Sequence, residues 1–139
     1  MSLSIRNQLP GTVVAVTPGE VMATVKVRLT GGQDLTAAIT REAAEDLGLG
    51  TGSAVRALVK STEVSLATAP VEGLSIRNQL PGTVTDIATG GAMATVRIGI
   101  EDGELTAAIT NDAVTDLGLS TGVPVVALIK STEVSLATT

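Results

Sequence analysis

The sequence contains no cysteine, no histidine and no aromatic residue among its 139 residues. Without cysteine and histidine, the chain cannot form disulfides, iron–sulfur clusters, the usual zinc sites, thiol nucleophiles or histidine-based catalytic triads. Without aromatic rings, the bases of single-stranded nucleic acid have no platform on which to stack. These absences remove the commonest catalytic and metal-binding side chains and predict an aliphatic core.

Positive charge is also scarce. The chain has nine basic and 14 acidic residues, which gives a net charge of −5. This balance argues against a nucleic-acid partner, because affinity for nucleic acid rests largely on neutralising phosphates. No apolar run approaches the roughly 20 residues of a membrane span, and no signal peptide is visible. We therefore expect a cytoplasmic protein with neither a nucleic-acid nor a membrane partner.

The chain consists of one unit written twice. Residues 4–13, 35–40 and 60–68 return unchanged as residues 75–84, 105–110 and 130–138. The copies predict two domains, residues 1–69 and 74–139, joined by a linker at residues 70–73 that contains proline and glycine. A unit of this size is marginally stable alone, so we expect the copies, or several chains, to pack together.

Each copy reads as mainly β. In the first copy, β-branched and alternating segments predict strands at residues 3–7, 11–17, 21–29, 35–39, 53–60 and 63–67. Thr40 is expected to cap a short helix that Gly48 or Gly50 ends, and the chain is expected to break at Ser61. The order favours two tandem OB-like β-barrels, each with one short helix, with a β-sandwich as the competing architecture.

No pattern points to catalysis. The carboxylates kept in both copies fall near turns or on the helix surface, where solvation and capping explain them. Neither a nucleophile elbow nor a nucleotide-binding fingerprint is present. The sequence therefore predicts no enzyme, no catalytic residue, no cation site and no cofactor.

Two polar segments kept in both copies have the chemistry of an anion site. Ser4 and Arg6 lie two residues apart, so on a strand both would point to one face. Arginine offers a planar fork of charged donors, and Lys60 and Ser61 add a second charge and a second hydroxyl. Both of the latter could reach one ligand only if the strand breaks there. This donor set suits a small, fully ionised oxyanion such as molybdate, tungstate or sulfate.

The combined pattern resembles the Mop, or molbindin, domain. The resemblance rests on SIRNQLPGTV at residues 4–13, MATVKV at 22–27, LTAAITREAAEDLGL at 35–49 and ALVKSTEV at 57–64. Two such domains in one chain are similar to a tandem molbindin. The resemblance implies OB-like barrels, cytoplasmic binding and storage of molybdate or tungstate, and a homotrimer of six Mop domains with oxyanions at the interfaces between domains.

The resemblance also implies which residues bind the oxyanion. They are Ser4, Arg6, Thr40, Lys60 and Ser61 in the first copy and Ser75, Arg77, Thr110, Lys130 and Ser131 in the second. Family members often carry Asn-Ala-Glu where this chain has methionine, alanine and threonine from Met22 and from Met93. That difference leaves the main pocket intact and removes a polar group beside it.

Two other functions compete with oxyanion binding. One is an OB-type module that binds single-stranded nucleic acid or another protein, which would need a basic groove with aromatic platforms. The other is an oligomerisation module without an oxyanion ligand, in which the arginines and lysines form interface ion pairs with Glu63 or Glu133.

Overall fold

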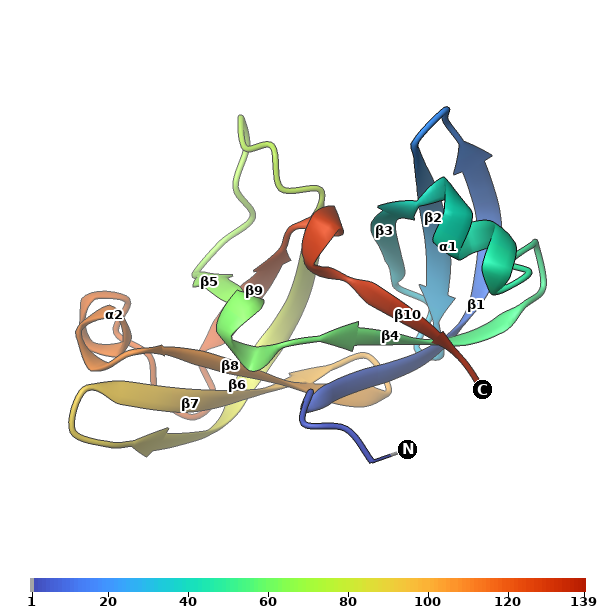
Figure 1. Cartoon of the computed structure of the whole chain (residues 1–139). Coiled ribbons are helices and arrows are strands. Elements are labelled where there is room, and N and C mark those ends of the chain that lie inside the picture. Colours follow the sequence, from blue (N-terminus) through green and yellow to red (C-terminus); the bar gives the residue numbers. More distant parts are fainter. Residues whose placement is uncertain (1) are drawn as a thin grey trace.

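The computed structural model describes residues 2–139, and Met1 of the first predicted domain lies outside the described residues. The first repeat forms β1 (Asn7–Pro18), β2 (Met22–Leu29), β3 (Asp34–Thr40), α1 (Arg41–Asp46), β4 (Ala54–Val59), the 3-10 helix η1 (Ser61–Glu63) and β5 (Ser65–Ala67). The second forms β6 (Asn78–Thr89), β7 (Met93–Ile100), β8 (Gly103–Thr110), α2 (Asn111–Asp116), β9 (Pro124–Ile129), η2 (Ser131–Glu133) and β10 (Ser135–Thr138). Figure 1 shows two curled sheets with one short helix each, which confirms the mainly β prediction.

The first strand differs from the expectation of two separate strands at residues 3–7 and 11–17. The residues before Asn7 are irregular, and β1 then runs unbroken through Pro10. Pairing with β2 begins only at Gly11, so the missing N–H of Pro10 removes no bond from that ladder. Because residues 4–6 are not a strand, the period-two argument does not set their side-chain directions.

The alternation expected in β2 is present. Ala23, Val25, Val27 and Leu29 are buried, and the residues between them are exposed. Val21, which the expected strand at residues 21–29 included, is 73% exposed because it precedes β2 in the β1–β2 turn. The core that these strands build is wholly aliphatic, and its apolar cluster includes residues from both repeats.

Each sheet takes its last strand from the other repeat. The sheet orders are β10-β4-β1-β2-β3 and β5-β9-β6-β7-β8. After β4, η1 turns the chain away from its own sheet, so β5 pairs with β9, while β10 returns to pair with β4 (Figure 1). The sequence repeats therefore do not coincide with the sheets, and each repeat needs the other to complete its edge.

Two buried asparagines hold the repeats together. Asn7 and Asn78 are each 4% exposed. The side-chain amide of Asn7 donates to the Thr106 carbonyl oxygen and accepts from the Thr106 N–H, both at 2.8 Å. Asn78 makes the same two bonds, also at 2.8 Å, with Thr36. Each amide thus pairs with the backbone of the other repeat as a neighbouring strand would.

The β2–β3 turn lies directly against the β7–β8 turn. A Cβ added at Gly31 would overlap the carbonyl oxygen of Glu101, so only glycine allows this approach. The second turn is shorter, with residues 101–102 against residues 30–33 in the first, and Asp102 takes a positive φ of 53° there. One long and one short hairpin therefore meet at the contact between repeats.

The helices are short, with six residues in each of α1 and α2. Over residues 2–139, no helix is both long enough and apolar enough to cross a membrane.

Candidate functional site

The two polar segments of the first repeat meet at the end of the β1–β4 ladder. The last residue pair of this ladder is Asn7 opposite Val59. Arg6, just before β1, and Lys60, just after β4, are therefore neighbours beyond the end of the ladder. They border a cavity of about 220 Å³ lined by Ser4, Ile5, Arg6, Lys60, Ser61 and Thr62. Four of the five residues predicted for the first copy are therefore brought together.

The strand ends at the point where the side chains of Lys60 and Ser61 must both face one ligand. Lys60 is extended, with φ −65° and ψ 138°, and it caps η1, which begins at Ser61. In a continuous strand the two side chains would point to opposite faces. The 3-10 turn places both on the cavity, as the sequence argument required.

The hydroxyl oxygens at the start of η1 and η2 lack internal partners. Ser61 Oγ and Ser131 Oγ are buried, and neither makes a hydrogen bond within the described residues. Buried polar atoms in folded proteins are nearly always hydrogen-bonded, so an unpartnered hydroxyl calls for an explanation. A ligand oxygen in the cavity would supply the missing partner.

The Arg6 side chain is partly held in place. Its Nε donates to the Ser4 carbonyl oxygen at 3.1 Å, and its Nη2 donates to the Leu3 carbonyl oxygen at 2.8 Å. These two bonds fold the guanidinium back over its own segment and leave three of its five N–H groups for a ligand. The Arg6 guanidinium is therefore held in position and can still donate hydrogen bonds to a ligand.

The charges at the cavity have no carboxylate partner. Two ion pairs occur in the part of the chain that the structure describes, Arg28–Asp34 at 3.0 Å and Arg41–Glu45 at 2.9 Å. The hydrogen bond from Arg28 lowers the pKa of Asp34. Arg6 and Lys60 take part in neither pair, so within the described residues both charges are available to a ligand.

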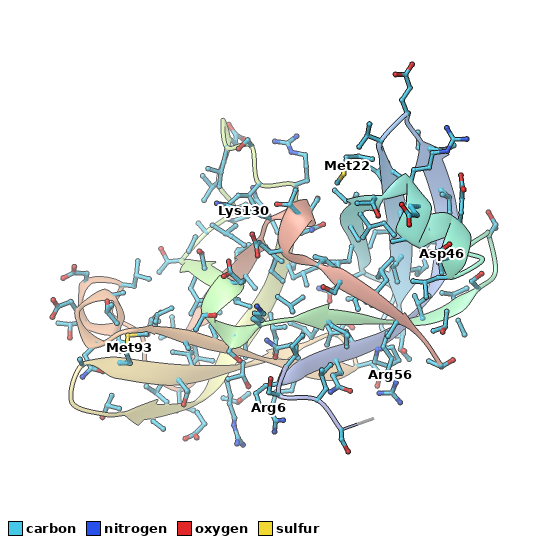
Figure 2. All side chains as sticks on the ribbon, viewed as in Figure 1. Arg6, Met22, Asp46, Arg56, Met93 and Lys130 are labelled. Atoms are coloured by element: carbon cyan, nitrogen blue, oxygen red, sulfur yellow. The ribbon has the colours of Figure 1, made fainter. Side chains whose placement is uncertain are left out.

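The second repeat builds an equivalent site. Asn78 lies opposite Ile129, which places Arg77 beside Lys130. Arg77 Nε donates to the Ser75 carbonyl oxygen at 3.2 Å, and Nη2 donates to that of Leu74. Figure 2 shows Arg6 and Lys130 well apart, so the two sets of candidate residues occupy separate places in the chain.

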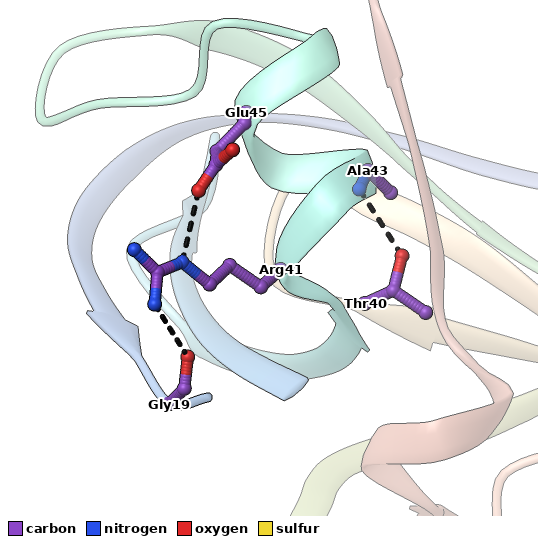
Figure 3. A network of polar contacts seen from close by, with 5 residues as sticks. All are labelled: Gly19, Thr40, Arg41, Ala43 and Glu45. Carbon is purple, nitrogen blue, oxygen red and sulfur yellow. Dashed lines mark hydrogen bonds and ion pairs between the residues drawn. The ribbon is translucent and has the colours of Figure 1, made fainter. Parts of the chain in front are cut away.

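Thr40 and Thr110 lie at a different place. Each caps its helix, with its hydroxyl oxygen accepting from the N–H three residues later at 3.1 Å. Figure 3 shows this bond for Thr40. Thr40 does not line the cavity formed by its own repeat. However, η2, which follows Lys130, contacts β3, which ends at Thr40. Likewise, η1, which follows Lys60, contacts β8, which ends at Thr110. Each lysine–serine segment therefore lies against the strand of the other repeat that carries the capping threonine.

Met22 and Met93, which stand where family members often have asparagine, lie beside these threonines. Met22 pairs with Thr40 and Met93 pairs with Thr110 in the strand registers. Their side chains are 44% and 48% exposed. Where the family often has a polar residue, this chain therefore presents an apolar surface next to the helix cap.

The asparagine pair was not singled out from the sequence, although a signal was present. In β1, Asn7 shares the inward face with Leu9 and Val13, at a spacing of two. A polar residue in line with core positions must find hydrogen-bond partners when it is buried. Because Asn7 directly follows Arg6, its bonds to Thr106 also locate the cavity relative to the second repeat.

A cation does not suit the donor set. Across residues 2–139, no group of three or more acidic side chains is arranged to hold a metal ion. The cavity residues offer ammonium, guanidinium and hydroxyl groups, which are donors to an anion.

Comparisons with known proteins agree with this chemistry. The chain is 43% identical over 136 residues to molybdenum-pterin-binding protein MopB of Rhodobacter capsulatus, covering 96% of this chain and 50% of that protein. It is 41% identical over 138 residues to molybdenum transport protein ModE of Azotobacter vinelandii, covering 99% of this chain and 51% of that protein. The chain thus spans about half the length of these curated relatives.

A solved structure matches the whole fold. The cytoplasmic molybdate-binding protein ModG, with molybdate bound, is 41% identical and superposes with a TM-score of 0.97 over 100% of both chains. The TOBE domain family matches residues 3–66 and again residues 74–136. The chain therefore belongs to the TOBE domain family, whose domain it carries twice, and is a relative of the molybdenum-pterin-binding proteins.

Proposed function

We propose that this protein binds molybdate or tungstate in the cytoplasm and serves in storage and homeostasis of these oxyanions. The observation that carries the proposal is the cavity where Arg6, Lys60 and Ser61 converge without a carboxylate partner. ModG, which has the same fold over the full chain, is described as a cytoplasmic molybdate-binding protein. The ligand is cargo, and no catalytic step is assigned to the site.

The physical basis is replacement of the hydration shell of a dianion. Burying such an ion is costly unless charge-assisted hydrogen bonds replace those to water. Arg6 and Lys60 supply the charge, and Ser4 and Ser61 add hydroxyl donors. Ser75, Arg77, Lys130 and Ser131 do the same in the second repeat. Val59 and Ile129, buried at the ends of their strands, fix the position of each lysine.

We further propose that the chain acts as a homotrimer with six domains. The contacts of η1 with β8 and of η2 with β3 support this proposal, because each lysine–serine segment lies against a strand of the other repeat. In a trimer, Thr40 and Thr110 would join sites completed by a neighbouring domain. The exposed Met22 and Met93 adjoin those threonines and would be covered by the neighbour.

Calorimetric titration with sodium molybdate at 0.15 M NaCl tests the proposed function. We expect saturable heat and a melting temperature that rises with molybdate concentration, because the ligand binds only the folded form. At one hundred times the Kd the stabilisation is about 2.7 kcal/mol, or about 10 °C for a domain of this size. Sedimentation equilibrium with interference optics measures the oligomer. Absence of both heat and melting shift would contradict the proposal.

The unpartnered serines yield a sharper test. Replacing Ser61 and Ser131 together with alanine removes two buried hydroxyls that have no protein partner. We expect the free energy of unfolding to stay level or rise, because no internal hydrogen bond is lost. Molybdate affinity should fall about two- to tenfold at each site, corresponding to one hydrogen bond.

The matched control is replacement of Ser65 and Ser135 with alanine, since these serines are exposed and lie just after the same 3-10 helices. The control should leave affinity unchanged. A drop in stability in the Ser61 and Ser131 variant, with affinity intact, would show that the hydroxyls serve the fold instead of the ligand.

A further inference from the structure

The two oxyanion sites are identical in their binding segments but differ in what precedes them. Residues 75–84 repeat residues 4–13 without change. Ahead of Ser75, however, the chain carries the linker at residues 70–73, which includes Glu72. The residue of the first repeat that corresponds to Glu72 is Met1, whose side chain carries no charge.

The linker is held against the second site by a side-chain clamp. The Gln79 side chain accepts from the Val71 N–H at 3.0 Å and donates to the Val71 carbonyl oxygen at 2.9 Å. In the first repeat the equivalent Gln8 instead donates to the Ile5 carbonyl oxygen at 3.2 Å. The same glutamine therefore stabilises its own segment in one repeat and fastens the linker in the other.

The clamp holds a negative charge and a binding arginine in one short loop. It joins Val71 to Gln79, and Glu72, Ser75 and Arg77 lie between them in the chain. The Arg77 side chain itself donates to carbonyl oxygens of this loop, those of Ser75 and Leu74. Glu72 is exposed and belongs to neither of the two ion pairs found over residues 2–139. Its charge is therefore not neutralised by a partner.

The wider charge distribution acts in the same direction. Residues 1–69 hold six basic and six acidic residues, whereas residues 74–139 hold three basic and seven acidic ones. The first repeat is neutral, and the second repeat is net acidic. A dianion is therefore attracted less to the second repeat, and Glu72 adds a local repulsion.

We propose that the clamped linker, through Glu72, weakens the second oxyanion site, so that each chain offers one tighter and one weaker site. This rests on the proposed function, since it concerns the affinity of the same two sites. The consequence is binding over a wider range of oxyanion concentration than two equal sites would cover. One unit charge near a dianion in a solvent-exposed setting corresponds to about a fivefold difference in affinity.

Single-site variants allow each site to be measured alone. The Arg77→Ala chain reports the first site, and the Arg6→Ala chain reports the second. Titration with sodium molybdate at 0.05 M NaCl is expected to give about fivefold tighter binding in the Arg77→Ala chain. In 1 M NaCl, where the Debye length is about 3 Å, the difference should shrink toward equality.

Removing the linker charge identifies its source. Glu72→Gln in the Arg6→Ala chain should raise the affinity of the second site about threefold to fivefold. The same substitution in the Arg77→Ala chain should leave the first site unchanged. Asp116→Asn, on α2 at the end of the molecule away from the linker (Figure 1), changes net charge equally and should alter neither site.

The outcomes separate this inference from the proposed function. Equal affinities in the two single-site chains, or an equal response of both sites to Glu72→Gln, would overturn the inference while leaving oxyanion binding intact. Failure of the unsubstituted chain to bind molybdate would overturn the proposed function itself. Gln79→Ala, which releases the linker, should reproduce part of the gain at the second site, and a loss there would also contradict the inference.

Discussion

Replacing Arg6 and Arg77 together with alanine is expected to abolish measurable molybdate binding at concentrations that saturate the unsubstituted chain. Each guanidinium can donate two charge-assisted hydrogen bonds worth about 1.5–3 kcal/mol apiece, so the affinity of each site should fall by more than about 100-fold. Isothermal titration measures the loss. Circular dichroism should show that the sheets persist, because both arginines are exposed and bond only to nearby carbonyl oxygens of their own segments.

Two control variants make the result specific. Arg56→Ala with Arg97→Ala removes the same net charge from exposed strand positions that do not line the cavity, and it should change affinity little. Arg6→Lys with Arg77→Lys keeps the charge but loses the planar fork, so binding should fall to an intermediate level. Undiminished affinity in the double alanine variant would refute the assignment of the sites.

Replacing Asn7 and Asn78 with alanine is expected to produce the largest loss of stability. Each substitution leaves the N–H and carbonyl oxygen of one threonine of the other repeat without their side-chain partner. An unsatisfied buried polar group costs about 1–3 kcal/mol, so each substitution should cost about 2–6 kcal/mol and the double variant about 4–12 kcal/mol. That is a large fraction of the 5–15 kcal/mol typical of a folded domain. Urea unfolding followed by circular dichroism measures the change, since the chain has no aromatic fluorophore.

The asparagine variants also test how the sites are positioned. Gln8→Ala serves as the control, because Gln8 bonds only within its own segment. A loss of stability no greater than that of Gln8→Ala would contradict the role of the asparagines between repeats. In single variants that still fold, molybdate affinity should also weaken, since Asn7 and Asn78 directly follow the binding arginines in the chain.

Much of the local structure could be predicted from residue patterns. The alternation in β2, the Thr40 cap and the break at Ser61 are all present. These features depend on interactions within a few residues, such as the period of a strand or the bond from a cap to a nearby N–H. The pairing of the two polar segments was also foreseeable, because their residue types are complementary to one kind of ligand.

Other features depended on where distant segments lie. The start of β1 at Asn7 in place of a separate strand at residues 3–7, the exchange of β5 and β10, and the pairing of Asn7 with Thr106 leave little trace in short-range patterns. The residue pattern of β5 predicts a strand but does not indicate which sheet it joins. Its partner is decided by the direction in which η1 leaves the sheet and by the edge that the other repeat leaves open.

The sequence by itself determined the duplication, the mainly β character, the aliphatic core and the donor chemistry of the two sites. It did so because composition, period and residue type act locally and need no knowledge of neighbours in space. Only the tertiary structure decided that the repeats complete each other's sheets, that Asn7 and Asn78 fasten them together, and that Gln79 holds the linker. Those outcomes depend on contacts between residues far apart in the chain, whose partners are selected when the two repeats pack.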